Sequence, residues 1–261
     1  METLYVIKIG GNIIDDNQLL PDFLKKFAGI TSKKILVHGG GKLATRMAEK
    51  LEIPQQMIEG RRVTDGETLK IITMVYAGFI NKNIVARLQS FGCNAAGITG
   101  ADGNSILAHK RISTGVDYGF AGDIDQVNAA WFIRQLSDDT ALVVAPVTHD
   151  GKGQLLNTNA DTIAQEIATA LSNKYNVTLV YGFEKAGVLK DVEDENSVIR
   201  KLHAGYYKEL KETETVFAGM IPKLDNAFTA LDSGVHSVII GKAEELDLLI
   251  TGDSGTTITH E

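Results

Sequence analysis

The sequence has a single cysteine among its 261 residues, so no disulfide can form within the chain. A lone cysteine in an apolar region is most often a core residue, and we expect this of Cys93. The chain has only four prolines and no proline- or serine-rich linker, so any two lobes are expected to share one continuous sheet. Its 44% content of apolar residues is enough to fill a core without covalent cross-links.

Basic residues are also few, since 26 Lys and Arg face 33 Asp and Glu, which gives a formal net charge of −7. No basic cluster occurs that could neutralise a nucleic-acid backbone, which argues against a nucleic-acid partner. No apolar run approaches the roughly 20 residues needed to cross a bilayer. The first predicted strand begins near residue 3, which leaves no signal peptide. We therefore expect a cytoplasmic protein with no membrane partner.

Apolar runs and helical patterns alternate along most of the chain. Runs rich in Val, Ile and Leu predict strands near residues 4–9, 34–38, 94–98, 140–145, 177–181 and 236–240. Helical patterns lie near residues 17–28, 42–51, 66–91 and 160–172. This alternation predicts an α/β fold, a three-layer αβα sandwich around a mostly parallel central sheet.

Two helical segments carry apolar stripes that we expect to pack inward, Leu43, Met47 and Leu51 in one, and Leu224, Ala227, Phe228 and Leu231 in the other. The middle of the chain differs, because Gly and Asp break residues 105–125 and 147–156 into short segments that suit β-hairpins. A loose boundary near residues 173–177 divides the chain into lobes 1–174 and 175–261.

Glycines follow the first two predicted strands. The stretch YVIKIGGN, residues 5–12, places Lys8 near the end of an apolar strand, where its ammonium needs water, a carboxylate or an anionic ligand. The stretch HGGGK, residues 38–42, places three glycines before a helix, where backbone N–H groups can approach an anion. A tight turn without function is the alternative for these glycines.

A dinucleotide-binding pattern is a second interpretation of the same glycines. Gly39, Gly41 and Ala44 fit it, with Glu59 as the acidic partner, but they follow the second strand rather than the first. A Walker A motif is absent. Any nucleotide must therefore be held in another way.

Two arginines precede the long helical stretch. Arg61 and Arg62 stand before a capping-box pattern, Thr64 to Glu67, which starts that helix. Such arginines are either solvated surface residues or a clamp for a carboxylate.

The stretch NTNAD, residues 157–161, precedes another helix. Thr158 and Asp161 fit a helix cap, because an acidic residue in the first turn complements the helix dipole. Asn157 and Asn159 are more than a cap requires. Their amides could bind a polar small molecule at the carboxyl edge of the sheet.

A lysine opens the last long helix. Pro222 suits the first helical position and places Lys223 in the first turn, where the dipole disfavours a cation by a few tenths to about 1 kcal/mol. A bound anion would offset this, although a fully exposed lysine tolerates it. Lys8 and Lys223, with Asp161 between them, suit phosphoryl transfer, which needs no base if the acceptor is already a carboxylate. His38 is expected to be a hydrogen-bonded turn residue, and no histidine pairing predicts a metal site.

Five motifs occur in order and resemble those of the amino acid kinase family: Lys8-Ile-Gly-Gly, His38-Gly-Gly-Gly, Arg62-Val-Thr, Asn157-Thr-Asn-Ala-Asp161 and Gly219-Met-Ile-Pro-Lys223. The resemblance covers essentially the whole chain, and it is greatest to the branch formed by the N-acetylglutamate kinases. It implies transfer of the γ-phosphoryl group of ATP to the γ-carboxylate of N-acetyl-L-glutamate, the second step of arginine biosynthesis. Mg²⁺ would be bound mainly through the nucleotide phosphates.

The resemblance also implies roles for residues and lobes. Lys8 and Lys223 would stabilise the transferring phosphoryl group, and Asp161 would hold both ammonium groups. Lobe 1–174 would bind the acylglutamate and dimerise, and lobe 175–261 would bind ATP. Substrate-binding residues would be Gly40, Gly41, Arg62, Asn157 and Asn159. Nucleotide-binding residues would be Gly10, Gly11, Glu184, Gly187, Val188, Leu189, Val216 and Phe217.

The sequence departs from the family pattern in two places. Glu184 stands where the family has an aspartate, and the hairpin stretch 118–128, which helps to enclose the N-acyl group in the family, differs. N-succinylglutamate is therefore an open alternative acceptor. A kinase of the same fold that acts on another carboxylate acceptor such as aspartate or glutamate, on carbamate or on a nucleoside monophosphate is a further alternative. A catalytically silent effector-binding or dinucleotide-binding protein is the alternative outside enzymes. The amino-terminal helix of arginine-inhibited hexameric members is missing, so we expect a homodimer insensitive to arginine.

Overall fold

An eight-stranded sheet forms the centre of the computed structural model, which describes residues 1–58, 60–191, 193–213 and 220–260. In spatial order the strands are β12 (Lys201–Leu202), β14 (Thr256–Ile258), β13 (Ser237–Lys242), β11 (Asn176–Phe183), β1 (Thr3–Ile9), β2 (Lys33–His38), β8 (Ala141–Val144) and β5 (Ala95–Ile98). The six strands from β13 to β5 pair in parallel, and β14 pairs antiparallel with β13. The predicted mostly parallel sheet is confirmed.

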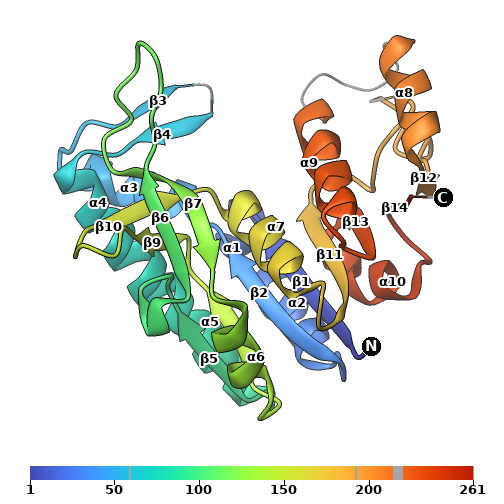
Figure 1. The fold of residues 1–261 in the computed structure, drawn as a ribbon, viewed down its shortest axis with the longest axis horizontal. Coiled ribbons are helices and arrows are strands. Elements are labelled where there is room, and N and C mark those ends of the chain that lie inside the picture. The colour runs from blue at the N-terminus through green and yellow to red at the C-terminus, as the bar shows by residue number, and fades with distance from the viewer. Residues whose placement is uncertain (59, 192, 214–219, 261) are drawn as a thin grey trace.

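Helices cover both faces of this sheet (Figure 1). One core contains side chains from α2 (Leu19–Ala28), α3 (Gly41–Lys50), α4 (Gly66–Ile72), η1 (Thr73–Ile80), α5 (Asn81–Ser90) and α10 (Leu246–Thr251). The other contains side chains from α6 (Ala129–Leu136), α7 (Ala160–Leu171), α8 (Ala204–Glu212) and α9 (Ile221–Asp232). The molecule is therefore the predicted three-layer αβα sandwich.

Side chains of β1 alternate between the two cores, as the period of a strand requires. Leu4 and Val6 belong to the core under α7 and α9, whereas Ile7 and Ile9 belong to the opposite core. Lys8 continues the series of Leu4 and Val6. Its side chain therefore emerges on the α7 and α9 face, at the carboxyl end of the strand.

The helix predicted over residues 66–91 is continuous but not uniform. α4 and α5 are α-helical, whereas η1 between them is π-helical. A π-helical stretch is uncommon and occurs frequently at functional sites. Tyr76 of this stretch lies beside the glycines that follow β2.

The stripe expectation for α3 is confirmed for Leu43, which packs against the core, and is wrong for Met47 and Leu51. Met47 and Leu51 are 37% and 53% exposed, whereas Ala44 and Ala48 are buried. Alanines let the helix approach its neighbours closely, and this rotates the larger side chains outward. The stripe of α9 does pack inward, since Leu224, Ala227 and Leu231 are buried and Phe228 packs against the same core.

Four short strands form a separate closed barrel, β6 (Ile106–Lys110), β7 (Ala121–Val127), β9 (Val147–His149) and β10 (Leu155–Thr158). β6 pairs antiparallel with β7, and β9 with β10, so both predicted hairpins are confirmed. Figure 1 shows them beside α7, away from β11 and β13. The remaining short elements are α1 (Gly11–Ile14), β3 (Gln56–Ile58), β4 (Arg61–Val63), η2 (Asp102–Asn104) and η3 (Ala243–Glu245).

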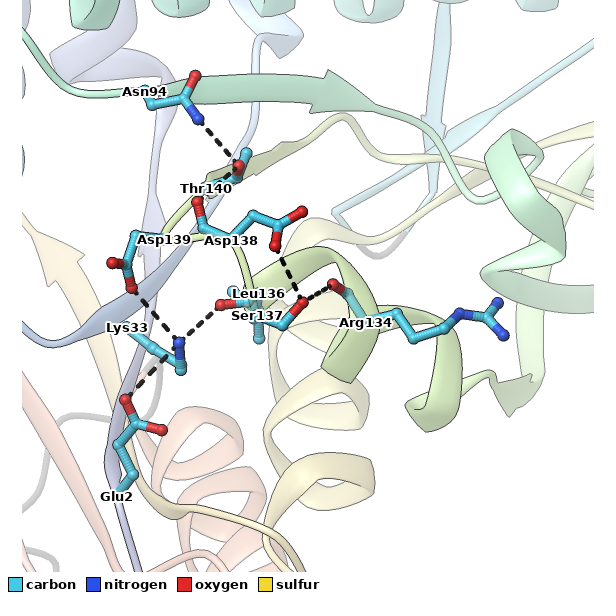
Figure 2. Close-up of polar contacts among 9 residues, drawn as sticks. All are labelled: Glu2, Lys33, Asn94, Arg134, Leu136, Ser137, Asp138, Asp139 and Thr140. Atoms are coloured by element: carbon cyan, nitrogen blue, oxygen red, sulfur yellow. Dashed lines mark hydrogen bonds and ion pairs between the residues drawn. The ribbon is translucent and has the colours of Figure 1, made fainter.

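Polar contacts tie the amino ends of the central strands together (Figure 2). Lys33 of β2 lies 3.6 Å from carboxylate oxygens of both Glu2 and Asp139, which precede β1 and β8. The amide of Asn94, before β5, donates to the hydroxyl of Thr140 at 3.0 Å. Cys93 beside it is buried, as predicted. These contacts hold the amino ends of neighbouring central strands together.

No helix in the described ranges has the length and apolar content needed to cross a membrane.

Candidate active site

Two cavities open at the carboxyl edge of the parallel strands. The large cavity, about 480 Å³, is lined by residues that follow β1 and β11 and by the start of α9. The small cavity, about 210 Å³, is lined by the glycines after β2 and by residues of β4, β7 and β10. Gly41 lines both, so the cavities meet at the glycine loop. The large cavity suits a nucleotide and the small one an amino-acid-sized molecule.

Lys8 borders the large cavity and pairs with Asp161. The ammonium lies 2.8 Å from Oδ1 of Asp161, and the two side chains are 15% and 31% exposed. β1 delivers Lys8 to the α7 face of the sheet, and Asp161 is the second residue of α7. The buried end of an apolar strand thus meets a carboxylate, as the sequence predicted.

Lys223 enters the same cavity from the first turn of α9. Its ammonium lies 3.7 Å from the ring centroid of Phe183, a cation–π contact. Burial lowers the pKa of Lys223, and the charge of Lys8 acts in the same direction, whereas Asp161 and Glu184 oppose it. A bound anion would favour the charged form of this amine.

Asp161 does not hold both ammonium groups by direct contact. Among the ion pairs of the described residues, Asp161 pairs with Lys8 and not with Lys223, although its charge acts to raise the pKa of Lys223. The ring of Phe183 supports Lys223 instead. Sequence reasoning had no signal for this role of an aromatic residue at a strand end.

The cap of α7 is Asn159 and not Thr158. The side-chain oxygen of Asn159 accepts from the backbone N–H groups of Asp161 and Thr162 at 2.8 and 3.1 Å. The hydroxyl of Thr158 instead bonds that of Thr148 at 2.7 Å, inside the barrel. Both Asn159 and Thr158 also line the small cavity. One asparagine therefore fixes the turn that presents Asp161.

The glycine loop after β2 needs glycine at one position. Gly40 has φ +149°, and a Cβ there would lie 2.3 Å from Cδ1 of Ile80 and 3.1 Å from the ring of Tyr76. A Cβ on Gly41 would meet nothing closer than 3.8 Å. The π-helical stretch η1 thus packs directly on the loop between the two cavities.

The buried side chain of His38 is hydrogen-bonded to this loop. Its Nδ1 is 2.8 Å from the carbonyl of Gly39, and its Nε2 is 3.2 Å from the amide nitrogen of Asn81. Burial lowers the pKa of His38 to about 4, so the ring is neutral near pH 7. A neutral ring donates through Nδ1–H and accepts through Nε2, which matches both contacts. His38 is a structural hydrogen-bonding residue, as expected.

Arg62 lies in β4 at the wall of the small cavity. Its guanidinium donates to the carbonyl of Gly41 at 3.2 Å, to the hydroxyl of Thr45 at 2.9 Å, and to the side chain of Gln55. A planar guanidinium fixed in this way is preset for a carboxylate. Arg61 lines the same cavity.

Asn157 reaches the small cavity from β10, and its amide donates to the hydroxyl of Thr64 at 3.0 Å. The capping-box pattern had predicted Thr64 as the cap of the following helix, and this prediction is wrong. Asp65 is the cap, because its carboxylate accepts from the N–H of Thr68 at 2.7 Å. Thr64 is buried and connects the segment after Arg62 with Asn157.

Only part of the predicted nucleotide-binding set lies at the large cavity. Gly10, Gly11 and Glu184 line it. Gly187, Val188 and Leu189 do not: the side chains of Val188 and Leu189 are 1% and 6% exposed, and Gly187 packs against Thr256. The other predicted residues, Val216 and Phe217, lie outside the described residues, as does Glu59.

Several lining residues had not been predicted. Tyr76 and Arg111 line the small cavity, and Arg111 pairs with Asp123 at 2.7 Å. The large cavity also contains side chains of Asn12, Ile13, Leu19, Lys42, Phe183 and Glu244. Lys42 directly follows the three glycines, which is the signal that could have identified it. In the part of the chain that the structure describes, no three His, Cys, Asp or Glu side chains gather as a candidate metal site.

Comparison with known proteins agrees with this geometry. The model of the amino acid kinase family matches residues 3–242. The chain belongs to the amino acid kinase family. Within that family, it is 57% identical over 251 residues to acetylglutamate kinase of Cytophaga hutchinsonii, a match that covers 96% of this chain and 95% of that protein. It is 50% identical to acetylglutamate kinase of Phocaeicola vulgatus, with 98% of each chain covered.

The fold of this amino acid kinase recurs in solved structures. The crystal structure of smu.665 from Streptococcus mutans has a TM-score of 0.78 and 25% sequence identity to this chain, and the match covers 99% of both chains. The predicted fold class, including its family type, is therefore confirmed.

Proposed function

We propose that this amino acid kinase transfers the γ-phosphoryl group of ATP to the γ-carboxylate of N-acetyl-L-glutamate. The product is N-acetyl-L-glutamyl 5-phosphate, and the reaction is the second step of arginine biosynthesis. Relatives named acetylglutamate kinase, 50–57% identical over nearly the full chain, support it. The observation that carries the proposal is the meeting of two cavities at Gly41, beside the Lys8–Asp161 pair and Lys223.

The charged groups of the site account for catalysis. Phosphoryl transfer spreads negative charge over the moving group, and proteins accelerate it mainly by positioning and by positive charge. Lys8 and Lys223 supply that charge, and the 2.8 Å contact with Asp161 holds Lys8 in place before a ligand arrives. The acceptor carboxylate is ionised at neutral pH, so no side chain needs to remove a proton.

The small cavity is the proposed acceptor site. Arg62 is assigned to the α-carboxylate, and Asn157 and Asn159 to the amide of the substrate. Gly40 and Gly41 are assigned to the reacting oxygens through their backbone N–H groups. The free N–H groups at the start of α3 support this assignment, because a helix amino terminus favours an anion.

The large cavity is the proposed ATP site. Gly10 and Gly11 leave room for the phosphates, and Glu184 is assigned to the nucleoside end. Gly187, Val188 and Leu189 are not part of its lining, and Val188 and Leu189 are buried. Mg²⁺ is proposed to be bound mainly through the phosphates, since it keeps several waters and takes few protein ligands in such sites. Bound there, it would neutralise charge on the phosphates.

We also propose that the protein is a homodimer that arginine does not inhibit. Lobe 1–174 is assigned to the acceptor and to the dimer contacts, and lobe 175–261 is assigned to ATP. Exposed Met74 and Phe79 on η1 support a dimer surface in the first lobe. The cytoplasmic location is likewise still a prediction.

An acceptor panel in a coupled assay of ADP release tests the reaction. N-acetylglutamate is expected to give the highest kcat/KM, and hydroxylamine is expected to trap its acyl phosphate. N-succinylglutamate is the alternative acceptor, and Arg61 and Arg111 in the small cavity are the cations that its extra carboxylate could meet. Higher kcat/KM with N-succinylglutamate, aspartate or carbamate would replace the proposed acceptor.

Variants of the two lysines test the mechanism. Lys8→Ala and Lys223→Ala are each expected to lower kcat by roughly 10²–10³, by analogy with the loss of an oxyanion-stabilising group. Lys174→Ala, which removes an exposed lysine outside both cavities, is the matched control and keeps wild-type turnover. Folded variants of Lys8 and Lys223 with unchanged turnover would exclude the mechanism and favour a catalytically silent binding protein.

A further inference from the structure

A third lysine stands at the large cavity. Lys42 is the second residue of α3, directly after the glycine loop, and its side chain lines the cavity with those of Lys8 and Lys223. Its ammonium donates to the side-chain oxygen of Asn12, the second residue of α1, which also lines the cavity. Lys42 is therefore directed across the start of α1 rather than along the surface of its own helix.

The position of Lys42 relative to the first glycine pair is informative. A Cβ on Gly11 would lie 3.8 Å from Cγ of Lys42, and a Cβ on Gly10 would lie 3.9 Å from Nζ of Lys8. The bare backbone of the two glycines is thus flanked by one lysine at each residue, and Oδ2 of Asp15 lies as close to the Gly11 position as Cγ of Lys42 does. An anion placed over this turn would have both ammonium groups within reach.

The charge of Lys42 is unfavourable where it stands. It lies in the first turn of a ten-residue helix, where the dipole disfavours a cation by a few tenths to about 1 kcal/mol. Among the described residues no carboxylate is within ion-pair distance of it, and its partner Asn12 is neutral. Among the described residues, Lys8, Lys42 and Lys223 line the cavity with Glu184 and Glu244, and Asp161 pairs with Lys8. Neither Lys42 nor Lys223 has a carboxylate within ion-pair distance in the described part of the chain, and an anion is the ligand that these two ammonium groups fit.

We propose that Lys42 is a phosphate-binding residue of the nucleotide site, in addition to Lys8 and Lys223. This inference rests on the proposed ATP site and adds a contact to it. The Lys42 ammonium exchanges the Asn12 oxygen for a phosphate oxygen of the bound nucleotide, and Asn12 keeps the side chain near that position beforehand. Lys42 therefore contributes to nucleotide affinity more than to the chemical step.

Calorimetric titration of the full-length protein with the non-hydrolysable ATP analogue AMP-PNP, in the presence of Mg²⁺, tests this. Lys42→Met is expected to raise the Kd for AMP-PNP roughly tenfold, as loss of one charge-assisted hydrogen bond does, and to leave the Kd for adenosine unchanged. Lys42→Arg is expected to restore binding to within about threefold, because the charge is kept. Lys50→Met, at the exposed last residue of the same helix, is the matched control.

Steady-state kinetics separate a binding role from a structural one. For Lys42→Met we expect the KM for ATP to rise roughly tenfold, with little change in kcat or in the KM for N-acetylglutamate. The difference from wild type should shrink as KCl is raised, because salt screens an exposed charge. Wild-type affinity for AMP-PNP in Lys42→Met would overturn the inference. Failure of the wild-type protein itself to bind AMP-PNP would instead overturn the proposed ATP site.

Discussion

His38 is a single ring whose titration should be visible in the stability of the whole chain. It is completely buried, and both ring nitrogens have partners in the folded state. Burial lowers its pKa from an ordinary 6.5 to about 4, and the charge of Lys82 acts in the same direction, against the hydrogen bond to Gly39. The unfolded chain therefore binds a proton at this ring more readily than the folded protein does.

This difference predicts how the free energy of unfolding depends on pH. The contribution of His38 is complete above about pH 6.5 and falls as the pH drops toward 4, by at most about 3 kcal/mol. Urea denaturation at pH 7.5, 6 and 5 measures it. His38→Asn should flatten the pH dependence in this window, whatever its effect on absolute stability, and His236→Asn, at an exposed histidine, is the matched control. An equal slope in His38→Asn would contradict the assignment.

At the scale of elements, the glycine loop and the π-helical stretch η1 depend on each other. Gly40→Ala places a methyl group against Ile80 and Tyr76, both buried, at a φ that side chains rarely adopt. We expect it to lower the free energy of unfolding by about 1–3 kcal/mol and to abolish most activity. Combined with Ile80→Ala, the total loss should be smaller than the sum of the two single losses, because truncating Ile80 relieves the steric contribution. Thermal and urea unfolding measure both variants.

Gly41→Ala is the matched control for this prediction. A methyl group at Gly41 makes only ordinary contacts, and the residue is the first of α3, where alanine suits a helix. Its stability should equal that of wild type or exceed it. If both alanine variants were destabilised alike, the loop would be intolerant of side chains in general, and the specific role of Gly40 would be wrong.

An element could be predicted from the sequence where a single sequence signal determines it. The positions of the charged residues and glycines relative to the ends of the predicted strands placed Lys8, Asp161 and the glycine loop at one edge of the sheet. The reason is that the carboxyl ends of parallel strands meet at the same edge. Competing signals were less reliable. Asn159 rather than Thr158 caps α7, and Asp65 rather than Thr64 caps α4. Which residue becomes the cap depends on where the backbone turns.

Helix orientation was the other limit. Spacing identified a face of α3, but whether that face turns inward depends on which neighbour packs most closely, and Ala44 and Ala48 decided it. Tertiary contacts also placed Phe183 under Lys223 and sent Val188 into the core. Neither follows from local sequence, because both depend on strands distant along the chain.

At the scale of the molecule, the apolar side chains exposed on η1 predict self-association. Met74 and Phe79 are 58% and 62% exposed on one helical stretch, and exposed apolar groups of this kind mark protein interfaces. Light scattering is expected to give twice the chain mass of 28.2 kDa, and Met74→Glu with Phe79→Glu should give the monomer. Ile112→Glu, at an isolated exposed residue, should remain dimeric. A mass of three dimers, or inhibition by arginine, would contradict the homodimer.

Gly41 belongs to the walls of both cavities, so we expect the occupancy of one cavity to change the affinity of the other. A change in the conformation of the glycine loop that the first ligand causes will affect the binding of the second ligand. Thermodynamic reciprocity then requires that each substrate alter the dissociation constant of its partner by the same factor. Titrating either substrate at several fixed concentrations of the other should give a single coupling free energy. The backbone of the glycine loop is the element that would transmit it.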